Sequence, residues 1–277
     1  MASEIVDRYG VMGYPVSHSR SPVIHRLFAL QTGQELQYEL LQVTPEKLEQ
    51  AVFQFRRTGG KGLNITVPHK TAVVPLMDQM SERASLAGAV NTLDFRDGRI
   101  FGDNTDGVGL RRDLLTNLGL ELRDVNILIL GAGGATRGII APLLAENPAS
   151  LTIANRSIGK AEQLVEQFAH CGPVNACRFS EVRGGKIFAL VINATSAGLK
   201  GATPPYPEAA VCQHTVCYDL SYGLKPTPFV AWAAAQGAAK AVMGWGMLVE
   251  QAAESFRLWR GVQPDTAAVL KQIAISA

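Results

Sequence analysis

Cysteine is scarce in this chain of 277 residues: there are four, and no two of them have the C-x-x-C spacing of redox or metal motifs. The five histidines are scattered as well. Disulfide frameworks and zinc sites need closely patterned cysteines and histidines. We therefore expect reduced thiols, no disulfide and no metal site.

Long apolar runs are also missing. A helix that spans a membrane needs about 20 consecutive apolar residues, and no segment approaches that length. The first residues, MASEIVDRYG, do not have the basic-then-apolar order of a secretion signal. The sequence therefore predicts a cytoplasmic protein without a membrane partner.

Charge is modest, with 18% charged residues, a net charge of +2 and no basic run. Proteins that bind nucleic acid usually carry a basic patch or stripe, so we do not expect a nucleic-acid partner. Hydrophobic residues make up 47% of the chain. A chain of this length and composition is typical of about two globular domains.

A glycine-rich stretch in the middle of the chain is the strongest local signal. Residues 127–130 (ILIL) predict a strand buried on both faces, and the glycines follow at once, before a segment of helical content from residue 139. The glycines and their neighbours are Gly131, Ala132, Gly133, Gly134 and Ala135. Strand, glycine turn and helix together favour dinucleotide binding over an ordinary structural turn, because the helix presents free N–H groups to phosphates. The sixth motif position is Thr136 instead of glycine, so close packing is expected of Ala135 and Gly138.

The next predicted strand, residues 151–154, indicates which dinucleotide is bound. It ends in Asn155, Arg156 and Ser157, with no acidic residue for a ribose 2′-hydroxyl. Arg156, with Lys160 one turn into the following helix, instead suits a 2′-phosphate. The alternative is a solvated pair of charges at a helix start. We expect NADP.

Polar residues follow the strands expected in the N-terminal part. A strand at residues 11–13 precedes Ser17 and Ser19, whose hydroxyls could equally serve loop solubility, and Ser21-Pro22 predicts a capped helix start. Residues 63–67 predict a strand in which Asn64 and Thr66 share a face. A buried polar pair needs partners, which makes both residues candidates for a ligand wall.

Further along, other short patterns predict strands at residues 36–43, 90–93, 189–195 and 216–220, and a hairpin turn at residues 97–98. Helices are predicted at residues 44–57, 81–89, 107–118 and 159–168, and from about 226 to 237. Two more, at residues 247–260 and 265–275, have no strand between them, and we place them against the N-terminal domain.

Motifs along nearly the whole chain resemble those of the shikimate dehydrogenases of aromatic amino-acid biosynthesis. In the family's order they are SHS at 17–19, NITVPHK at 64–70, GAVNT at 88–92, GDNTDG at 102–107, GAGGA at 131–135, NRS at 155–157, NATSAG at 193–198 and GMLVEQA at 246–252. Each motif alone is weak, but the ordered set is specific.

The resemblance implies reversible, NADPH-dependent reduction of 3-dehydroshikimate to shikimate by a monomer or homodimer. It implies Lys70 as the acid/base, with Asp106 beside it in the catalytic pair. The residues implied as substrate contacts are Ser17, Ser19, Asn64, Thr66, Asn91, Asp106, Tyr222 and Gln251. Three more, Glu82, Leu220 and Gly244, are implied near the cofactor. Trp245 is bulkier than expected beside a nicotinamide, and residues 223–227 depart from the family's spelling.

The implied chemistry agrees with the residue types. A polyhydroxylated acid needs many short donors and acceptors, which hydroxyls and amides supply without a metal. Hydride transfer to a ketone builds negative charge on its oxygen, which the Lys70 ammonium can stabilise and protonate. A structural interpretation would make Lys70 a surface lysine and Asp106 a helix N-cap. Which of the two moves the proton stays open at this point.

The resemblance implies an α/β fold with two domains. We expect a substrate-binding domain at residues 1–107, completed by 244–277, and a Rossmann-like, NADP-binding parallel sheet at 108–243, with the active-site cleft between them. Two other functions compete with this one. The first is a quinate/shikimate dehydrogenase-like paralogue that uses NAD, against which Arg156 argues. The second is an inactive NADP-binding regulatory domain, against which the Lys70/Asp106 pair argues.

Overall fold

The computed structural model describes residues 6–183, 185–195 and 206–276, and the chain forms two compact units. The first unit comprises Met1–Leu110 with Leu248–Ser276, and the second comprises Arg111–Met247. Of the motifs named above, residues 196–198 of NATSAG lie outside the described residues. Two helices continue across the boundaries between the units: α4 (Asp106–Arg112) and α8 (Trp245–Arg260).

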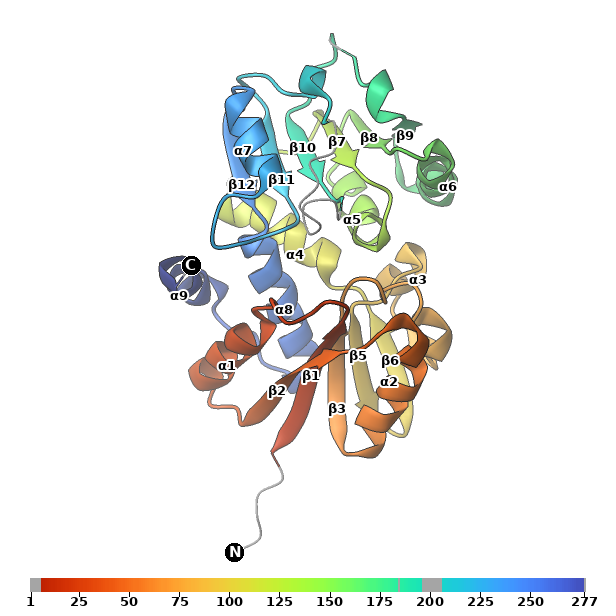
Figure 1. The fold of residues 1–277 in the computed structure, drawn as a ribbon, viewed down its shortest axis with the longest axis vertical. Coiled ribbons are helices and arrows are strands. Elements are labelled where there is room, and N and C mark those ends of the chain that lie inside the picture. The colour runs from red at the N-terminus through yellow and green to blue at the C-terminus, as the bar shows by residue number, and fades with distance from the viewer. Residues whose placement is uncertain (1–5, 184, 196–205, 277) are drawn as a thin grey trace, which may run out of the picture. The chain divides into compact units, whose positions relative to one another are not determined.

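The first unit is built on a six-stranded mixed sheet of order β2-β1-β3-β5-β6-β4 (Figure 1). Its strands are β1 (Asp7–Gly13), β2 (Leu36–Gln42), β3 (Gly60–Ile65), β4 (Gln79–Met80), β5 (Thr92–Arg96) and β6 (Arg99–Asp103). The first three are parallel, whereas β5 runs antiparallel to both β3 and β6. The helices are α1 (Ser21–Thr32), α2 (Leu48–Arg57), α3 (Glu82–Ala87), the first part of α4, most of α8, and α9 (Thr266–Ser276).

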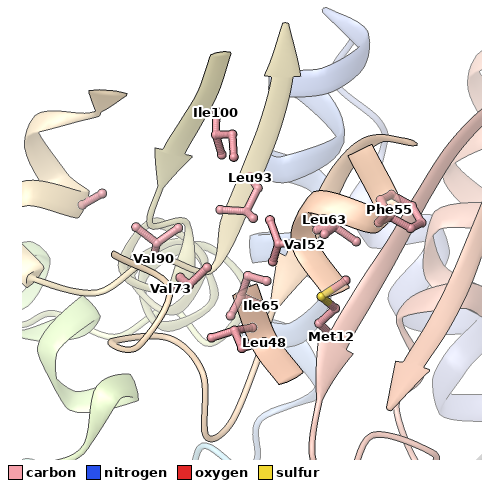
Figure 2. Packing of buried hydrophobic residues seen from close by; sticks show 11 residues of the cluster. Met12, Leu48, Val52, Phe55, Leu63, Ile65, Val73, Val90, Leu93 and Ile100 are labelled. Carbon is pink, nitrogen blue, oxygen red and sulfur yellow. The ribbon is translucent and has the colours of Figure 1, made fainter. Parts of the chain in front are cut away.

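One hydrophobic core holds this sheet to α2. Leu48, Val52 and Phe55 recur at helical spacing along α2 and are all at most 5% exposed. They pack against apolar side chains from the strands, including Met12 of β1 and Leu63 of β3 (Figure 2). The full cluster is Met12, Leu48, Val52, Phe55, Leu63, Ile65, Val73, Ala84, Val90, Leu93 and Ile100. Burial of this set fixes which face of the strands points inward.

The second unit is a six-stranded, fully parallel sheet. In chain order its strands are β7 (Asn126–Leu130), β8 (Ser150–Ala154), β9 (Val174–Cys177), β10 (Leu190–Asn193), β11 (Val216–Asp219) and β12 (Lys240–Met243). Its helices include α5 (Gly134–Leu144), α6 (Ile158–Phe168) and α7 (Pro228–Ala235). The spatial order β9-β8-β7-β10-β11-β12 is the Rossmann order, with the topological switch point between β7 and β10. The predicted α/β fold with a Rossmann-like sheet is confirmed.

Several predicted elements differ from the observed ones. The strand expected at residues 63–67 begins earlier, at Gly60, and ends at Ile65, so that Thr66 follows it. Only glycine fits at positions 60 and 62 of this strand, because added Cβ atoms would lie 2.2 Å from the Phe55 ring and 2.5 Å from Trp259 Nε1. β5 begins at Thr92 and not at residue 90. The short strands β4, β9 and β12 were not predicted.

Turn and capping chemistry is partly as expected. The hairpin at residues 97–98 is confirmed: Asp97 and Gly98 have φ values of 52° and 71° between β5 and β6. The expected cap by Ser21 is wrong, since Ser21 is the first residue of α1 and its N–H donates to Ser19 Oγ at 3.3 Å. The helix expected at 107–118 is α4 followed by a π-helical turn, Asp113–Asn117.

Among the described helices, none is long and apolar enough to cross a membrane.

His25 of α1 is completely buried in the first unit. Its ring stacks on that of Tyr38 from β2, with centroids 4.2 Å apart. Burial away from water lowers the pKa of His25 to about 3. The folded protein therefore holds this imidazole neutral at pH values where the unfolded chain protonates it.

This burial predicts acid-sensitive stability. Between the unfolded pKa of 6.5 and the folded pKa of about 3, the unfolded chain binds the extra proton, so the unfolding free energy falls as pH falls. The slope contributed by His25 is about 1.4 kcal/mol per pH unit. Urea unfolding between pH 7 and pH 5 is expected to show a steeper loss for the wild type than for His25→Phe. His18→Gln, which changes an exposed histidine, is the control; equal slopes for all three proteins would contradict the assignment.

Candidate active site

An ion pair stands at the centre of the polar residues of the first unit. Lys70 follows β3, and its Nζ lies 2.5 Å from Oδ2 of Asp106, the first residue of α4. Only 12% of the lysine side chain and 4% of the aspartate side chain are exposed. The carboxylate also lies at a helix N-terminus, where negative charge is favoured. Lys70 is therefore not a surface lysine, and Asp106 is the first residue of α4 instead of the residue before it.

Asn91 completes the hydrogen bonding of the Asp106 carboxylate. The Asn91 Nδ2 donates to Asp106 Oδ1 at 2.9 Å, while Asn91 Oδ1 accepts the backbone N–H of Thr105 at 2.8 Å. A backbone N–H can only donate, so it fixes which end of the carboxamide faces the carboxylate. Asn91 Nδ2 also lies 3.3 Å from Oε1 of Gln251 on α8. Hydrogen bonds thus connect Lys70, Asp106, Asn91 and Gln251.

Asn64 extends the same network into the sheet. Its Oδ1 accepts the Tyr38 hydroxyl at 2.7 Å, and its Nδ2 lies 3.2 Å from the Asn91 carbonyl oxygen and 3.0 Å from Ser255 Oγ. The side chain is 6% exposed. The partners that a buried amide requires are therefore present within the protein.

The remaining predicted residues of this unit lie at the ends of neighbouring strands. Thr66, after β3, packs so closely on Gly13 of β1 that an added Cβ there would lie 2.4 Å from Thr66 Cγ2. Ser17 is exposed in the loop after β1, and the Ser19 hydroxyl donates to Ser21 Oγ at 3.1 Å. Among the described contacts, none joins Ser17, Ser19 or Thr66 to the ion pair.

The network contains residues that sequence reasoning missed: Tyr38, Thr92, Thr105 and Ser255. Three of them carried a usable signal. Thr105 lies inside the GDNTDG motif, directly before Asp106, and Ser255 stands four residues after Gln251, on the same face of α8. Thr92 likewise lies inside the GAVNT motif, directly after Asn91, whereas Tyr38 became visible only through strand pairing.

In the second unit the glycine turn has the expected conformation. Gly131 has a φ of +107°, and its N–H donates to the Ala154 carbonyl oxygen at 2.8 Å. The expectation that small residues alone provide close packing is incomplete. Thr136 is fully buried, and its hydroxyl donates to the Gly131 carbonyl oxygen at 3.0 Å. The residue that departs from the motif therefore closes the turn.

The turn leaves the start of α5 suited to an anion. A Cβ added to Gly133, the N-cap residue, would meet no atom within 4 Å, and no described side chain caps the helix. The first N–H groups of α5 therefore have no described side-chain cap, and such groups can donate to a pyrophosphate. Arg156, Ser157 and Lys160 are exposed after β8, and Asn155 braces their turn through a 2.9 Å hydrogen bond from its Nδ2 to the Ser157 carbonyl oxygen.

Leu220 and Gly244 lie together after β11 and β12. A Cβ on Gly244 would lie 2.8 Å from the Leu220 carbonyl oxygen, so only glycine fits there. The unexpectedly large Trp245 packs on Tyr222, with ring centroids 4.7 Å apart. Glu82 is exposed in the first turn of α3, in the first unit.

Asp219 holds the loop that carries Tyr222. Its Oδ1 accepts the Ser221 N–H and the Asn193 Nδ2, both at 3.0 Å, and its Oδ2 accepts the Thr227 hydroxyl at 2.6 Å. Burial raises the pKa of this carboxyl against the opposing effect of these hydrogen bonds. The loop is thus tied at both ends to the carboxyl edge of the parallel sheet.

The chain combines a Rossmann sheet, which has a glycine turn before α5, with a second α/β unit that carries a shielded lysine–aspartate pair. This combination is typical of a two-domain α/β dehydrogenase. Profiles of known families agree. Residues 11–93 match the shikimate dehydrogenase substrate binding domain, residues 114–201 match shikimate / quinate 5-dehydrogenase, and residues 244–274 match the shikimate 5'-dehydrogenase C-terminal domain.

Individual proteins give the same result. The chain is 54% identical to a shikimate dehydrogenase (NADP(+)) of Alkalilimnicola ehrlichii over 96% of this chain and 98% of that protein. Its structure is similar to that of an Ael1 enzyme from Pseudomonas putida, with 47% identity, a TM-score of 0.86 and coverage of 96% and 97%. It is also similar to shikimate 5-dehydrogenase from Thermus thermophilus in complex with NADP(H) and shikimate, with 34% identity, a TM-score of 0.83 and coverage of 96% and 97%. The chain belongs to the shikimate dehydrogenase family.

Proposed function

We propose that this protein catalyses the reversible, NADPH-dependent reduction of 3-dehydroshikimate to shikimate. The observation that carries the proposal is the Lys70–Asp106 ion pair, 2.5 Å long and withdrawn from water, at the positions of the family's NITVPHK and GDNTDG motifs. We further propose that the protein acts in the cytoplasm, where its cysteines would stay reduced, and that it is a monomer or homodimer.

NADPH supplies the hydride when it is bound, and the second unit offers groups that fit it. The residues proposed to hold its pyrophosphate are Gly131, Ala132, Gly133, Gly134 and Ala135, where the first N–H groups of α5 are free of described side-chain caps. The 2′-phosphate would be contacted by Arg156 and Lys160, which are both exposed. Asn155 and Ser157 would shape the turn that carries them. Leu220 and Gly244, and less specifically Glu82, would contact the remainder of the cofactor.

Lys70 is the proposed proton donor in the direction of reduction. Its ammonium answers the negative charge that develops on the ketone oxygen and then gives that oxygen a proton; in oxidation it takes the proton back. Asp106 accepts from Lys70 at 2.5 Å through Oδ2 and from Asn91 at 2.9 Å through Oδ1. We assign Asp106 the role of orienting Lys70 and a substrate hydroxyl.

The other polar residues are proposed to bind the ring substituents and carboxylate of the substrate. They offer short donors and acceptors, which polyhydroxylated ligands require. This set is Ser17, Ser19, Asn64, Thr66, Asn91, Asp106, Tyr222 and Gln251. Of these, Ser17 is exposed, whereas Asn64 and Asn91 are almost completely buried.

An absorbance assay tests the activity itself. Purified protein is expected to form reduced nicotinamide from shikimate and NADP⁺, because Lys70 can accept the hydroxyl proton as hydride leaves. The same assay with quinate and with NAD⁺ separates the proposed enzyme from a quinate-using relative. Absence of turnover with every pair would instead favour a nucleotide-binding protein without catalysis.

Arg156→Ala tests the cofactor assignment. Loss of a charge-assisted contact to the 2′-phosphate is expected to weaken NADPH binding about 10- to 100-fold and to leave NADH binding unchanged. Dissociation constants from nucleotide titration check this. Arg178→Ala, at an exposed arginine after β9, is the control. Equal losses for both nucleotides would refute a 2′-phosphate contact.

Lys70→Ala and Asp106→Asn test the division of labour in the ion pair. Because charge on the reacting oxygen exists chiefly in the transition state, Lys70→Ala is expected to lower kcat by about 10²- to 10⁴-fold with little change in KM. Asp106→Asn keeps the shape and is expected to lose less turnover. Steady-state kinetics with Lys61→Ala, an exposed lysine in β3, as control measure both. Near-normal kcat for Lys70→Ala would make Lys70 a binding residue.

A further inference from the structure

Three hydroxyl side chains lie behind the proposed substrate wall and have no part in the chemistry described so far. Thr92 begins β5, Thr105 precedes α4, and Ser255 lies in α8. We call them the hydroxyl cluster. All three are at most 1% exposed, so a substrate in solution reaches none of them directly. They come from segments far apart in the chain and meet at one point.

Ser255 is the centre of the cluster. Its Oγ lies 2.8 Å from Thr92 Oγ1, 3.3 Å from Thr105 Oγ1 and 3.0 Å from Asn64 Nδ2, and it donates to the Gln251 carbonyl oxygen at 3.1 Å. A hydroxyl has one proton and two lone pairs. Four polar neighbours therefore saturate Ser255 and fix its position.

The cluster touches both buried carboxamides of the site. Thr92 Oγ1 donates to Asn91 Oδ1 at 2.9 Å and lies 3.2 Å from Asn64 Nδ2. Thr105 Oγ1 accepts from Asn91 Nδ2 at 2.9 Å. Asn91 in turn donates to Asp106. Thr92 thus limits how both amides can rotate or shift, whereas Ser255 restrains Asn64 and Thr105 restrains Asn91.

We infer that the hydroxyl cluster of Thr92, Thr105 and Ser255 is a positioning device that sets the place of Asn64, Asn91 and Gln251 for substrate binding. The inference rests on the proposed function. It assigns no proton transfer to the cluster, because none of its oxygens contacts Lys70 or Asp106 among the described hydrogen bonds. A positioning role makes the affinity for shikimate, more than the chemical step, depend on these hydroxyls.

Ser255→Ala is the first test. Removal of Oγ deletes the shortest of the three contacts of Asn64 Nδ2, at 3.0 Å, and leaves the two at 3.2 Å, so the carboxamide is held less firmly. We expect the KM for shikimate to rise about tenfold, the size of one lost buried hydrogen bond, while kcat falls less and the KM for NADP⁺ is unchanged. Steady-state kinetics on the full-length enzyme and thermal unfolding are measured for every variant.

Matched variants separate positioning from stability. Ser150→Ala removes another largely buried serine hydroxyl, which donates to Asn126 Oδ1 at 2.9 Å in the second unit. It is expected to lower Tm without changing the KM for shikimate. Thr92→Val keeps the side-chain shape but not the hydroxyl, and is expected to reproduce the KM defect, whereas Thr92→Ser is expected to restore it. If Ser255→Ala does not fold, the Thr92 pair decides.

The possible results distinguish a failure of the positioning role from a failure of the proposed enzymatic activity. If Ser255→Ala and Thr92→Val lower Tm but keep the wild-type KM for shikimate, the cluster is structural only and the inference is overturned. If kcat falls with KM constant, positioning for binding is equally refuted. If the wild type itself does not oxidise shikimate, the proposed function fails, which the wild-type reaction in the same assay reveals.

Discussion

Two opposite charges withdrawn from water are stable only when neighbouring groups complete their hydrogen bonds, and the Lys70–Asp106 pair imposes that demand on the first unit. The attraction between the two ions offsets their desolvation only if the remaining acceptor positions are filled. Asn91 fills one on Asp106, the Thr105 backbone orients Asn91, and Asn64 lies against the Asn91 carbonyl oxygen. The amides are in this sense the second layer of the ion pair. The orientation of the Asn91 amide follows from its partners, because the Thr105 backbone N–H can only donate and the Asp106 carboxylate can only accept.

The parts of the fold that were predictable from sequence are those with local causes. The turn at Gly131 and the hairpin at residues 97–98 need positive φ values, and the residues present tolerate them. The buried strand β7 is indicated by its apolar run. By contrast, β12 has four residues without a period. β3 starts at Gly60, a residue that is usually read as a strand breaker, and here the Phe55 ring leaves no room for any side chain. These two strands depend on contacts between residues far apart in the chain, which a local sequence pattern does not show.

The same distinction applies to the site. Motif spacing and strand alternation pointed to Asn64, Asp106 and their neighbours, since residues of one motif share one turn or one strand. The Tyr38 hydroxyl reaches Asn64 only because β2 and β3 flank β1 in one sheet. The return of the C-terminal helices to the first unit was expected from sequence, but the contact of Ser255 with Asn64 depends on how α8 packs there. Short-range pattern therefore finds candidate polar residues, whereas their partners depend on topology.

The return of α8 to the first unit also governs when that unit can be completed during synthesis. Asn64 and its partner Ser255 are 191 residues apart, and Asn91 and Gln251 are 160 apart. Chains are elongated at about 5–20 residues per second, so Asn64 is added to the chain about 10 to 40 seconds before Ser255. Throughout that interval Gly62 has no Trp259 indole to cover it, and the Leu93 carbonyl oxygen lacks the N–H that the indole later donates at 2.9 Å. The Rossmann sheet, by contrast, is contiguous in the chain. Its strands β7 to β12 are therefore made in one run, between the two parts of the chain that together form the first unit.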